Sequence, residues 1–316
     1  MKKSPALSRR QFLAAASTAT AAVSLLPRAR ARAAKPAAGL HIATNTYPWG
    51  TFAKREGKAF PLHTDASLAA IASCGVAGYE PAVKAPAEFD GLAARLKAHG
   101  LEMRSLYVNS VLHDDAQAKS SISEVLAIAR RAVESGAKII VTNPSPIRWG
   151  GPENKTDAQL ITQAKALDTL GSELGALGLT LAYHNHDIEL RHGGREFHHM
   201  LTATDPLKVK LCLDAHWVFR GCGNSQVALF DVVEHYGTRI VELHLRQSRG
   251  GVWTEVFTAE GDIDYRRLME WLRRKRLSPH LVLEQAVEKG SPQTVDGVEA
   301  HRRSADHTRT LFAAFD

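Results

Sequence analysis

Residues 178–189 have the sequence GLTLAYHNHDIE, and they contain the unit from which the fold can be predicted. A glycine suited to the end of a helix precedes a short apolar run over residues 180–184. The amphipathic stretch before it, residues 157–177, is typical of a long helix. The segment therefore predicts a helix, then a buried strand, then a group of polar side chains where the strand ends.

The same unit recurs through most of the chain. Seven further apolar runs predict strands over residues 40–46, 76–80, 102–108, 138–142, 208–214, 240–245 and 280–284. Amphipathic stretches predict further helices over residues 67–73, 88–99, 121–135, 226–235 and 265–275. Eight strands that alternate with helices favour an α/β fold of the (β/α)8 TIM-barrel type, in which all strands are parallel.

An open, doubly wound sheet is the main alternative fold. Such sheets usually carry a glycine-rich phosphate-binding loop after the first strand. Here the first predicted strand is followed by NTYPWG over residues 45–50, which does not fit the GxGxxG pattern. We therefore favour the barrel, and we expect Tyr47, Trp49, Trp217 and Trp253 in loops or at strand ends.

The first 33 residues differ from the rest of the chain. Arg9 and Arg10 precede a mildly apolar segment over residues 12–26, and residues 1–33 contain no acidic side chain. This pattern predicts a twin-arginine signal peptide over residues 1–33, cleaved near Ala33, with an uncleaved anchor as the alternative. We therefore expect a single barrel domain over residues 34–316, a periplasmic or secreted location, and the twin-arginine export machinery as a partner.

Charge and cysteine content exclude several classes of protein. The whole chain has 40 basic and 33 acidic residues, but seven of the basic residues lie in the predicted signal. The remainder is therefore balanced at zero net charge, which argues against nucleic acid as a partner. The three cysteines lack CxxC spacing, which excludes a zinc finger and argues against a disulfide framework.

Polar residues of metal-binding types end the last four predicted strands. In a TIM barrel, functional residues come from the carboxyl ends of the strands, so these side chains would converge at one part of the barrel mouth. The candidate ligands are His184, Asp214, His244 and Glu284. A mixed oxygen and nitrogen set suits a divalent metal such as Mn²⁺, Mg²⁺, Co²⁺, Fe²⁺ or Zn²⁺.

Further polar and aromatic residues are placed to support such a site. His186, Glu189 and His216 could orient the metal ligands or contact substrate. Arg246 faces the same side of its strand as His244, because side chains alternate along a strand, and it could hold substrate or form a salt bridge at the rim. Substrate contact or a purely structural role is open for two other residues, Glu80 and Trp217.

The order of these motifs resembles a known family. HNHDIE at 184–189, LDAH at 213–216, HLR at 244–246 and LEQ at 283–285 are similar to the sugar phosphate isomerase/epimerase superfamily of xylose-isomerase-like barrels. The resemblance covers most of residues 39–315. It implies metal ligands Glu, Asp, His and Glu on strands five to eight. Asp214, His244 and Glu284 match the last three, whereas His184 stands where the family has the first glutamate.

The resemblance implies a metal-dependent isomerase or epimerase that acts through proton abstraction and an enediolate. Glu284 would remove the proton, and His186 or Glu189 would return one. Because His184 replaces the partner of Glu284, a lyase or dehydratase that eliminates from a keto-sugar or inosose is an alternative. A non-catalytic periplasmic sugar-binding barrel is another. Export argues for an unphosphorylated sugar as the small-molecule partner, and a homo-oligomer is possible.

Overall fold

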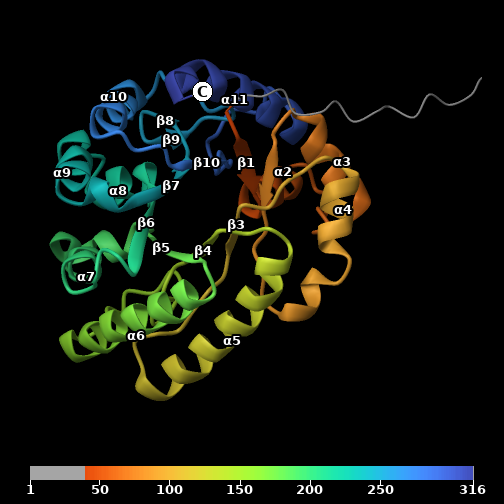
Figure 1. Ribbon diagram of the computed structural model, residues 1–316. Coiled ribbons are helices and arrows are strands. Elements are labelled where there is room, and N and C mark those ends of the chain that lie inside the picture. The colour runs from red at the N-terminus through yellow and green to blue at the C-terminus, as the bar shows by residue number, and fades with distance from the viewer. Residues whose placement is uncertain (1–39, 316) are drawn as a thin grey trace, which may run out of the picture. The chain divides into compact units, whose positions relative to one another are not determined.

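Eight parallel strands surround a central axis in the computed structural model, which describes residues 40–315, and helices cover the strands from outside (Figure 1). The strands of this sheet are β1 (Ile42–Asn45), β2 (Gly78–Glu80), β3 (Ser105–Tyr107), β4 (Ile139–Thr142), β5 (Thr180–His184), β6 (Val209–Asp214), β7 (Ile240–Leu245) and β10 (His280–Leu283). Each predicted strand is present, and β5 and β7 have the predicted bounds.

The sheet closes almost completely into a barrel. Its strands are paired in the order β2-β1-β10-β7-β6-β5-β4-β3. Isolated parallel bridges between Gly78 and Glu102, and between Ala82 and Tyr107, join the two ends of this order. The backbone N–H of Tyr79, for example, donates to the carbonyl oxygen of Glu102 at 2.9 Å. The (β/α)8 prediction is therefore confirmed.

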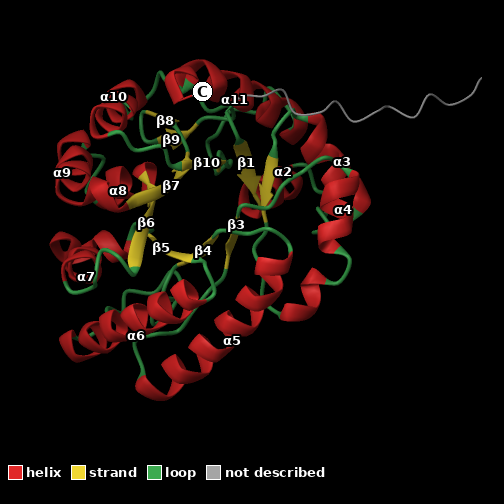
Figure 2. Cartoon of the chain, in the orientation of Figure 1, coloured by secondary structure: helices red, strands yellow, loops and turns green. Residues whose placement is uncertain are grey.

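Helices follow most strands and form the outer layer (Figure 2). They are α2 (Thr46–Arg55), α3 (Asp65–Ser73), α4 (Leu92–Ala98), α5 (Asp115–Glu134), α6 (Asp157–Ala176), α7 (Arg191–Thr202), α8 (Ala215–Gly221), α9 (Gln226–Tyr236), α10 (Tyr265–Lys275) and α11 (Gly297–Leu311). The 3-10 turns are η1 (Pro86–Phe89), η2 (Ile188–Leu190), η3 (Gly237–Arg239) and η4 (Ala313–Phe315). A hairpin of β8 (Ser248–Arg249) and β9 (Val252–Trp253) lies between β7 and α10 along the chain.

The segment after β1 is a helix, not the expected loop. Asn45 caps α2, because its side chain accepts a hydrogen bond from the backbone N–H of Tyr47 at 3.2 Å. Pro48 lies within the first turn, where a missing N–H costs the helix nothing. Tyr47 and Trp49 therefore lie on α2. Trp217 likewise lies on α8 rather than in a loop.

The helices bury apolar faces against the outside of the barrel. Helix α6 starts with a capping box between Thr156 and Gln159 and buries a leucine stripe that includes Leu167 and Leu170. Its close approach to the start of β6 requires a glycine. A Cβ atom at Gly171 would lie 2.5 Å from the carbonyl oxygen of Lys208. Packing of this kind holds the strand ends, and therefore the site, in place.

The predicted signal peptide, residues 1–33, and its cleavage site near Ala33 lie outside the described residues. Among residues 40–315, no helix has both the length and the apolar character needed to cross a membrane.

Candidate active site

The four candidate metal ligands converge at the carboxyl ends of neighbouring strands. His184 ends β5, Asp214 ends β6, His244 lies in β7, and Glu284 directly follows β10. All four are buried, with exposed fractions between 0% and 6%. Ligand atoms of His184, Asp214 and Glu284 lie within 4.8 Å of one another. Nδ1 of His244 lies 2.6 Å from Oε2 of Glu284. The predicted residues therefore form one cluster.

Each of these four side chains keeps one buried atom without a hydrogen-bond partner. These atoms are His184 Nε2, Asp214 Oδ2, His244 Nδ1 and Glu284 Oε2. Buried polar atoms are nearly always hydrogen-bonded, so four such atoms in one cluster require an explanation. Two imidazole nitrogens and two carboxylate oxygens are a suitable donor set for a divalent transition metal. The residues present therefore fit a metal ion.

Asp214 combines a capping role with a free oxygen. Its Oδ1 accepts a hydrogen bond from the backbone N–H of Trp217 at 2.9 Å, which caps α8. Asn185 pairs with its backbone, since Nδ2 of Asn185 donates to the Asp214 carbonyl and Oδ1 accepts from the Asp214 N–H. These contacts fix the end of β6 and leave Oδ2 for the cluster. The capping and metal-binding interpretations are thus compatible.

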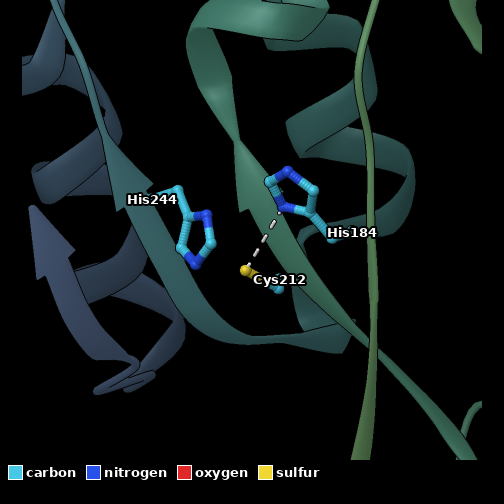
Figure 3. A group of neighbouring side chains, drawn as sticks. All are labelled: His184, Cys212 and His244. Atoms are coloured by element: carbon cyan, nitrogen blue, oxygen red, sulfur yellow. Dashed lines mark hydrogen bonds between the residues drawn. The ribbon is translucent and has the colours of Figure 1, made fainter. Parts of the chain in front are cut away.

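Glu242 is a buried carboxylate next to the cluster. It contacts His244 directly, and it contacts Cys212, which lies beside His184. Oε1 of Glu242 accepts from His244 Nε2 at 3.2 Å and from Cys212 Sγ at 3.4 Å. Oε2 lies 3.0 Å from Nδ1 of His280. Figure 3 shows Cys212 Sγ between the two imidazoles, and it lies 3.6 Å from Nδ1 of His184. These contacts of Glu242 were not predicted from the sequence, although Glu242 lies two residues before His244 and so faces the same side of β7.

Glu80, at the end of β2, lies beside the same histidine. Its Oε1 is 3.1 Å from Nε2 of His244 but has no hydrogen-bond partner, whereas its Oε2 accepts from Ser105 Oγ at 2.7 Å. Burial, and then the nearby Glu242 carboxylate, raise the pKa of Glu80 to about 8. Although burial raises the pKa of Glu242, hydrogen bonds from His244 and His280 hold it well below its ordinary value. The two carboxylates therefore differ in charge near neutral pH.

Arg246 supplies a buried positive charge next to the cluster. Its Nη2 lies 3.1 Å from Oε1 of Glu284 and 3.6 Å from Oδ2 of Asp214, and no hydrogen-bond geometry is reached. The guanidinium carbon lies 4.2 Å from the ring centre of Trp253 and 4.9 Å from that of Trp217, as in cation–π contacts. Although burial raises the pKa of Glu284, His244 and Arg246 hold it well below its usual range. Glu284 is therefore ionised.

A cavity of about 230 Å³ opens beside the cluster. Its volume is that of about eight water molecules, which is room for one small polyol. The lining residues are Asn45, Thr46, Tyr47, Glu80, Ala82, Tyr107, Asn109, His186 and Glu284. Of the sequence-predicted residues, Glu80, His186 and Glu284 therefore face this space. Asn45, Tyr107 and Asn109 are lining residues that sequence reasoning did not single out.

Glu189 and His216 lie near the site without lining this cavity. Oε1 of Glu189 accepts from Asn143 Nδ2 at 3.1 Å, and Oε2 accepts from the backbone N–H of His186 at 2.7 Å. Glu189 thus anchors the loop that carries His186. Nδ1 of His216 lies 3.4 Å from the indole nitrogen of Trp253, so it holds one of the rings around Arg246. Burial lowers the pKa of His186 to about 4, so this imidazole is neutral at pH 7.

The fold is a TIM barrel, and its candidate site lies at the carboxyl ends of the strands. Residues 68–311 match the family described as xylose isomerase-like TIM barrel. Because the match covers more than half of the chain, the protein belongs to this family. A comparison of the sequence with curated proteins finds no match.

Solved structures with the same fold include several sugar isomerases and epimerases. A sugar phosphate isomerase/epimerase from Parabacteroides distasonis is 17% identical, with a TM-score of 0.66 over 88% of this chain and 96% of that one. The 3-keto-D-glucoside 4-epimerase of E. coli is 16% identical, with a TM-score of 0.65 over 86% and 99%. A D-allulose 3-epimerase from Methylomonas sp., in complex with D-allulose, is 12% identical, with a TM-score of 0.66 over 86% and 97%. At these identities the likeness shows the fold.

Proposed function

We propose that the protein is a divalent-metal-dependent isomerase or epimerase of an unphosphorylated sugar or sugar derivative. One observation carries the proposal: ligand atoms of His184, Asp214 and Glu284 lie within 4.8 Å of one another at the ends of their strands. Nδ1 of His244 lies 2.6 Å from Glu284, which also lines the adjacent cavity. Membership of the xylose isomerase-like family and the named sugar epimerases of the same fold support it.

His184, Asp214, His244 and Glu284 would hold the metal. When bound, a divalent cation polarises a carbonyl or hydroxyl oxygen and lowers the pKa of the neighbouring C–H group. This donor set suits several metals, since Mn²⁺, Fe²⁺, Co²⁺ and Zn²⁺ all accept mixed nitrogen and oxygen ligands.

Glu284 is the proposed general base. Its ionised carboxylate lines the cavity, so it can reach the carbon next to a substrate carbonyl. The C–H bond breaks, the proton passes to the carboxylate, and the electron pair forms the double bond of an enediolate. His244 and Arg246 keep Glu284 ionised before the reaction, because His244 Nδ1 lies 2.6 Å from Oε2 and the guanidinium lies 3.1 Å from Oε1.

His186 is the proposed second proton carrier. It lines the cavity, and its Nδ1 has no hydrogen-bond partner. Glu189 fixes the backbone of His186 and has both oxygens engaged, so it acts by positioning rather than by proton transfer. Return of a proton to carbon gives an isomer or an epimer.

Elimination by a lyase or dehydratase is the second candidate. The observation that favours it is the histidine at position 184, which leaves Glu284 without a second carboxylate on β5. In that reaction Glu284 would take the proton, and His186 would protonate a β-oxygen as its bond to carbon breaks. The product would then have lost water or an alcohol, whereas an isomer keeps the mass of the substrate.

The lining of the cavity bears on the class of sugar. None of the described residues that line it is a lysine or arginine, the usual partners of a phosphate. This favours a neutral sugar over a sugar phosphate. Export by the twin-arginine machinery to the periplasm or medium would agree with such a substrate, and it remains part of the proposal.

The test is turnover of unphosphorylated ketoses, aldoses and 3-keto-glucosides in D₂O, with and without added Mn²⁺ or Co²⁺, followed by NMR and mass spectrometry. Metal-dependent formation of an isomer with deuterium at the reacting carbon supports the proposal. A product lighter by water or an alcohol favours the lyase. Binding of a sugar with no exchange of its C–H proton would contradict both and indicate a sugar-binding barrel.

A further inference from the structure

The interior of the barrel directly below the cluster is polar. TIM-barrel interiors are filled mainly by branched apolar side chains. Here the fully buried Glu242 lies among His244, Cys212 and His280. A buried carboxylate costs several kcal/mol unless hydrogen bonds compensate it, so its presence in the core calls for a role.

One hydrogen bond to Glu242 determines which ring nitrogen of His244 faces the cluster. The Nε2–H of His244 donates to Oε1 of Glu242, which places the ring proton on Nε2. Nδ1 is then the nitrogen left for a metal, and it is the unpartnered atom that faces Glu284. Carboxylates that accept from the far nitrogen of a ligating histidine fix its tautomer and orientation.

A second contact reaches the other histidine through a thiol. The thiol of Cys212 donates to Oε1 of Glu242 at 3.4 Å, so its sulfur is free to accept from Nδ1–H of His184 at 3.6 Å. With the proton on Nδ1, the lone pair of His184 is on Nε2, the atom that has no partner. Both histidines are thus set in opposite tautomers, each with its free nitrogen toward the cluster.

We propose that Glu242 is a positioning residue that orients both histidine ligands of the metal site, His244 directly and His184 through Cys212. His280 holds the second oxygen of Glu242 from the other side. The inference rests on the proposed function, since it requires that a metal binds at the cluster. It adds a role for residues that do not contact the metal or the substrate.

Glu80 provides a matched control. Its Oε1 lies 3.1 Å from the same His244 nitrogen, compared with 3.2 Å for Glu242, but it makes no hydrogen bond there. Glu80→Gln therefore replaces an acidic side chain at a similar distance from His244 and leaves the orienting contact intact. Glu242→Gln replaces an acceptor of three donors by an amide whose NH₂ group cannot accept.

The experiment is a Co²⁺ titration of the purified metal-free protein and its variants, by calorimetry and by the visible absorption of bound cobalt. We expect Glu242→Gln to weaken binding by about 10- to 100-fold and to change the cobalt spectrum. Glu80→Gln should keep an affinity close to that of the unaltered protein. Cys212→Ala removes the thiol that links Glu242 to His184 and leaves the contact between Glu242 and His244. It should weaken binding to a smaller extent, and it covers the case in which Glu242→Gln does not fold.

The outcomes separate the two proposals. If the unaltered protein binds Co²⁺ and the folded Glu242→Gln and Cys212→Ala variants bind it equally well with the same spectrum, the positioning role is wrong and the metal site stands. Equal weakening by Glu80→Gln would also overturn it, because any change to an acidic side chain beside His244 would then explain the loss. If the unaltered protein binds no Co²⁺, the metal-dependent function fails as well.

Discussion

Nδ1 of His244 lies 2.6 Å from Oε2 of Glu284, yet the two atoms do not meet in hydrogen-bond geometry and neither has another partner. Two buried polar atoms this close together, neither of them hydrogen-bonded, are placed to be ligands of one cation. The other nitrogen of His244 is held by Glu242. The histidine therefore connects the proposed metal site to the polar interior of the barrel.

Glu284→Gln should remove most of the turnover. The amide cannot take a proton from carbon, and general-base catalysis contributes about 10²- to 10⁴-fold to a rate, so kcat should fall by at least this factor. The measurement is steady-state kinetics on the sugar identified by the D₂O screen. Glu134→Gln, on the exposed end of α5, is the control and should turn over normally. An active Glu284→Gln variant would eliminate Glu284 as the base.

His186→Asn should separate the two proton transfers. Glu284 still removes the substrate proton, but the second carrier is lost, so deuterium should enter unreacted substrate faster than product forms. NMR of substrate and product in D₂O measures both rates. Equal slowing of exchange and product formation would argue that His186 acts before or during the first proton transfer.

Two glycines of α6 should respond in opposite directions to alanine. A Cβ at Gly171 would lie 2.5 Å from the Lys208 carbonyl oxygen, so Gly171→Ala should destabilise the fold by about 1–3 kcal/mol. A Cβ at Gly175 meets nothing within 4 Å, so Gly175→Ala should stabilise it by up to about 1 kcal/mol through helix propensity. Urea unfolding measures both. Similar effects of the two changes would contradict the close packing of α6 on β6.

The buried His301 should make the protein less stable in acid. Its ring stacks on Trp49, its Nδ1 lies 2.6 Å from the Gly297 carbonyl oxygen, and burial lowers its pKa to about 4. The unfolded chain binds this proton near pH 6.5, so stability is lost as the pH falls from about 6.5 to 4, by about 3 kcal/mol. In His301→Phe the free energy of unfolding should fall less between pH 7 and pH 4. An unchanged pH dependence would contradict the neutral, buried state of His301.

Strand positions and the polar residues at the strand ends could be predicted from the sequence because both depend on local pattern. Continuous apolar runs marked the strands, and alternation placed Arg246 on the same face as His244. The predicted helix over residues 88–99 is instead η1 and α4, because Gly91 has a left-handed backbone with φ of 70°. The helix α2 was missed because its first residues, Thr46 and Tyr47, resemble a loop, and its cap is visible only in the structure.

The contacts of Glu242 could not be predicted in this way. They join β7 to β6 through Cys212 and to β10 through His280, so they depend on how strands far apart in the sequence face one another. The same holds for Glu189, whose distance of three residues from His186 does not reveal that it binds the backbone N–H of that residue. For Glu242, the available signal in the sequence was a polar residue on the inward face of a buried strand.

The most direct test of the central claim is metal analysis of the protein purified without chelators, together with Asp214→Asn. The amide introduced by this change would keep an oxygen to cap α8 but lose the carboxylate oxygen that faces the cluster. Asp114→Asn, at the exposed start of α5, is the matched control. The proposed site predicts about one divalent metal per chain in the unaltered protein and the control, and much less in Asp214→Asn. Equal metal content in all three proteins, or none in any, would contradict a metal site at the ends of β5, β6, β7 and β10.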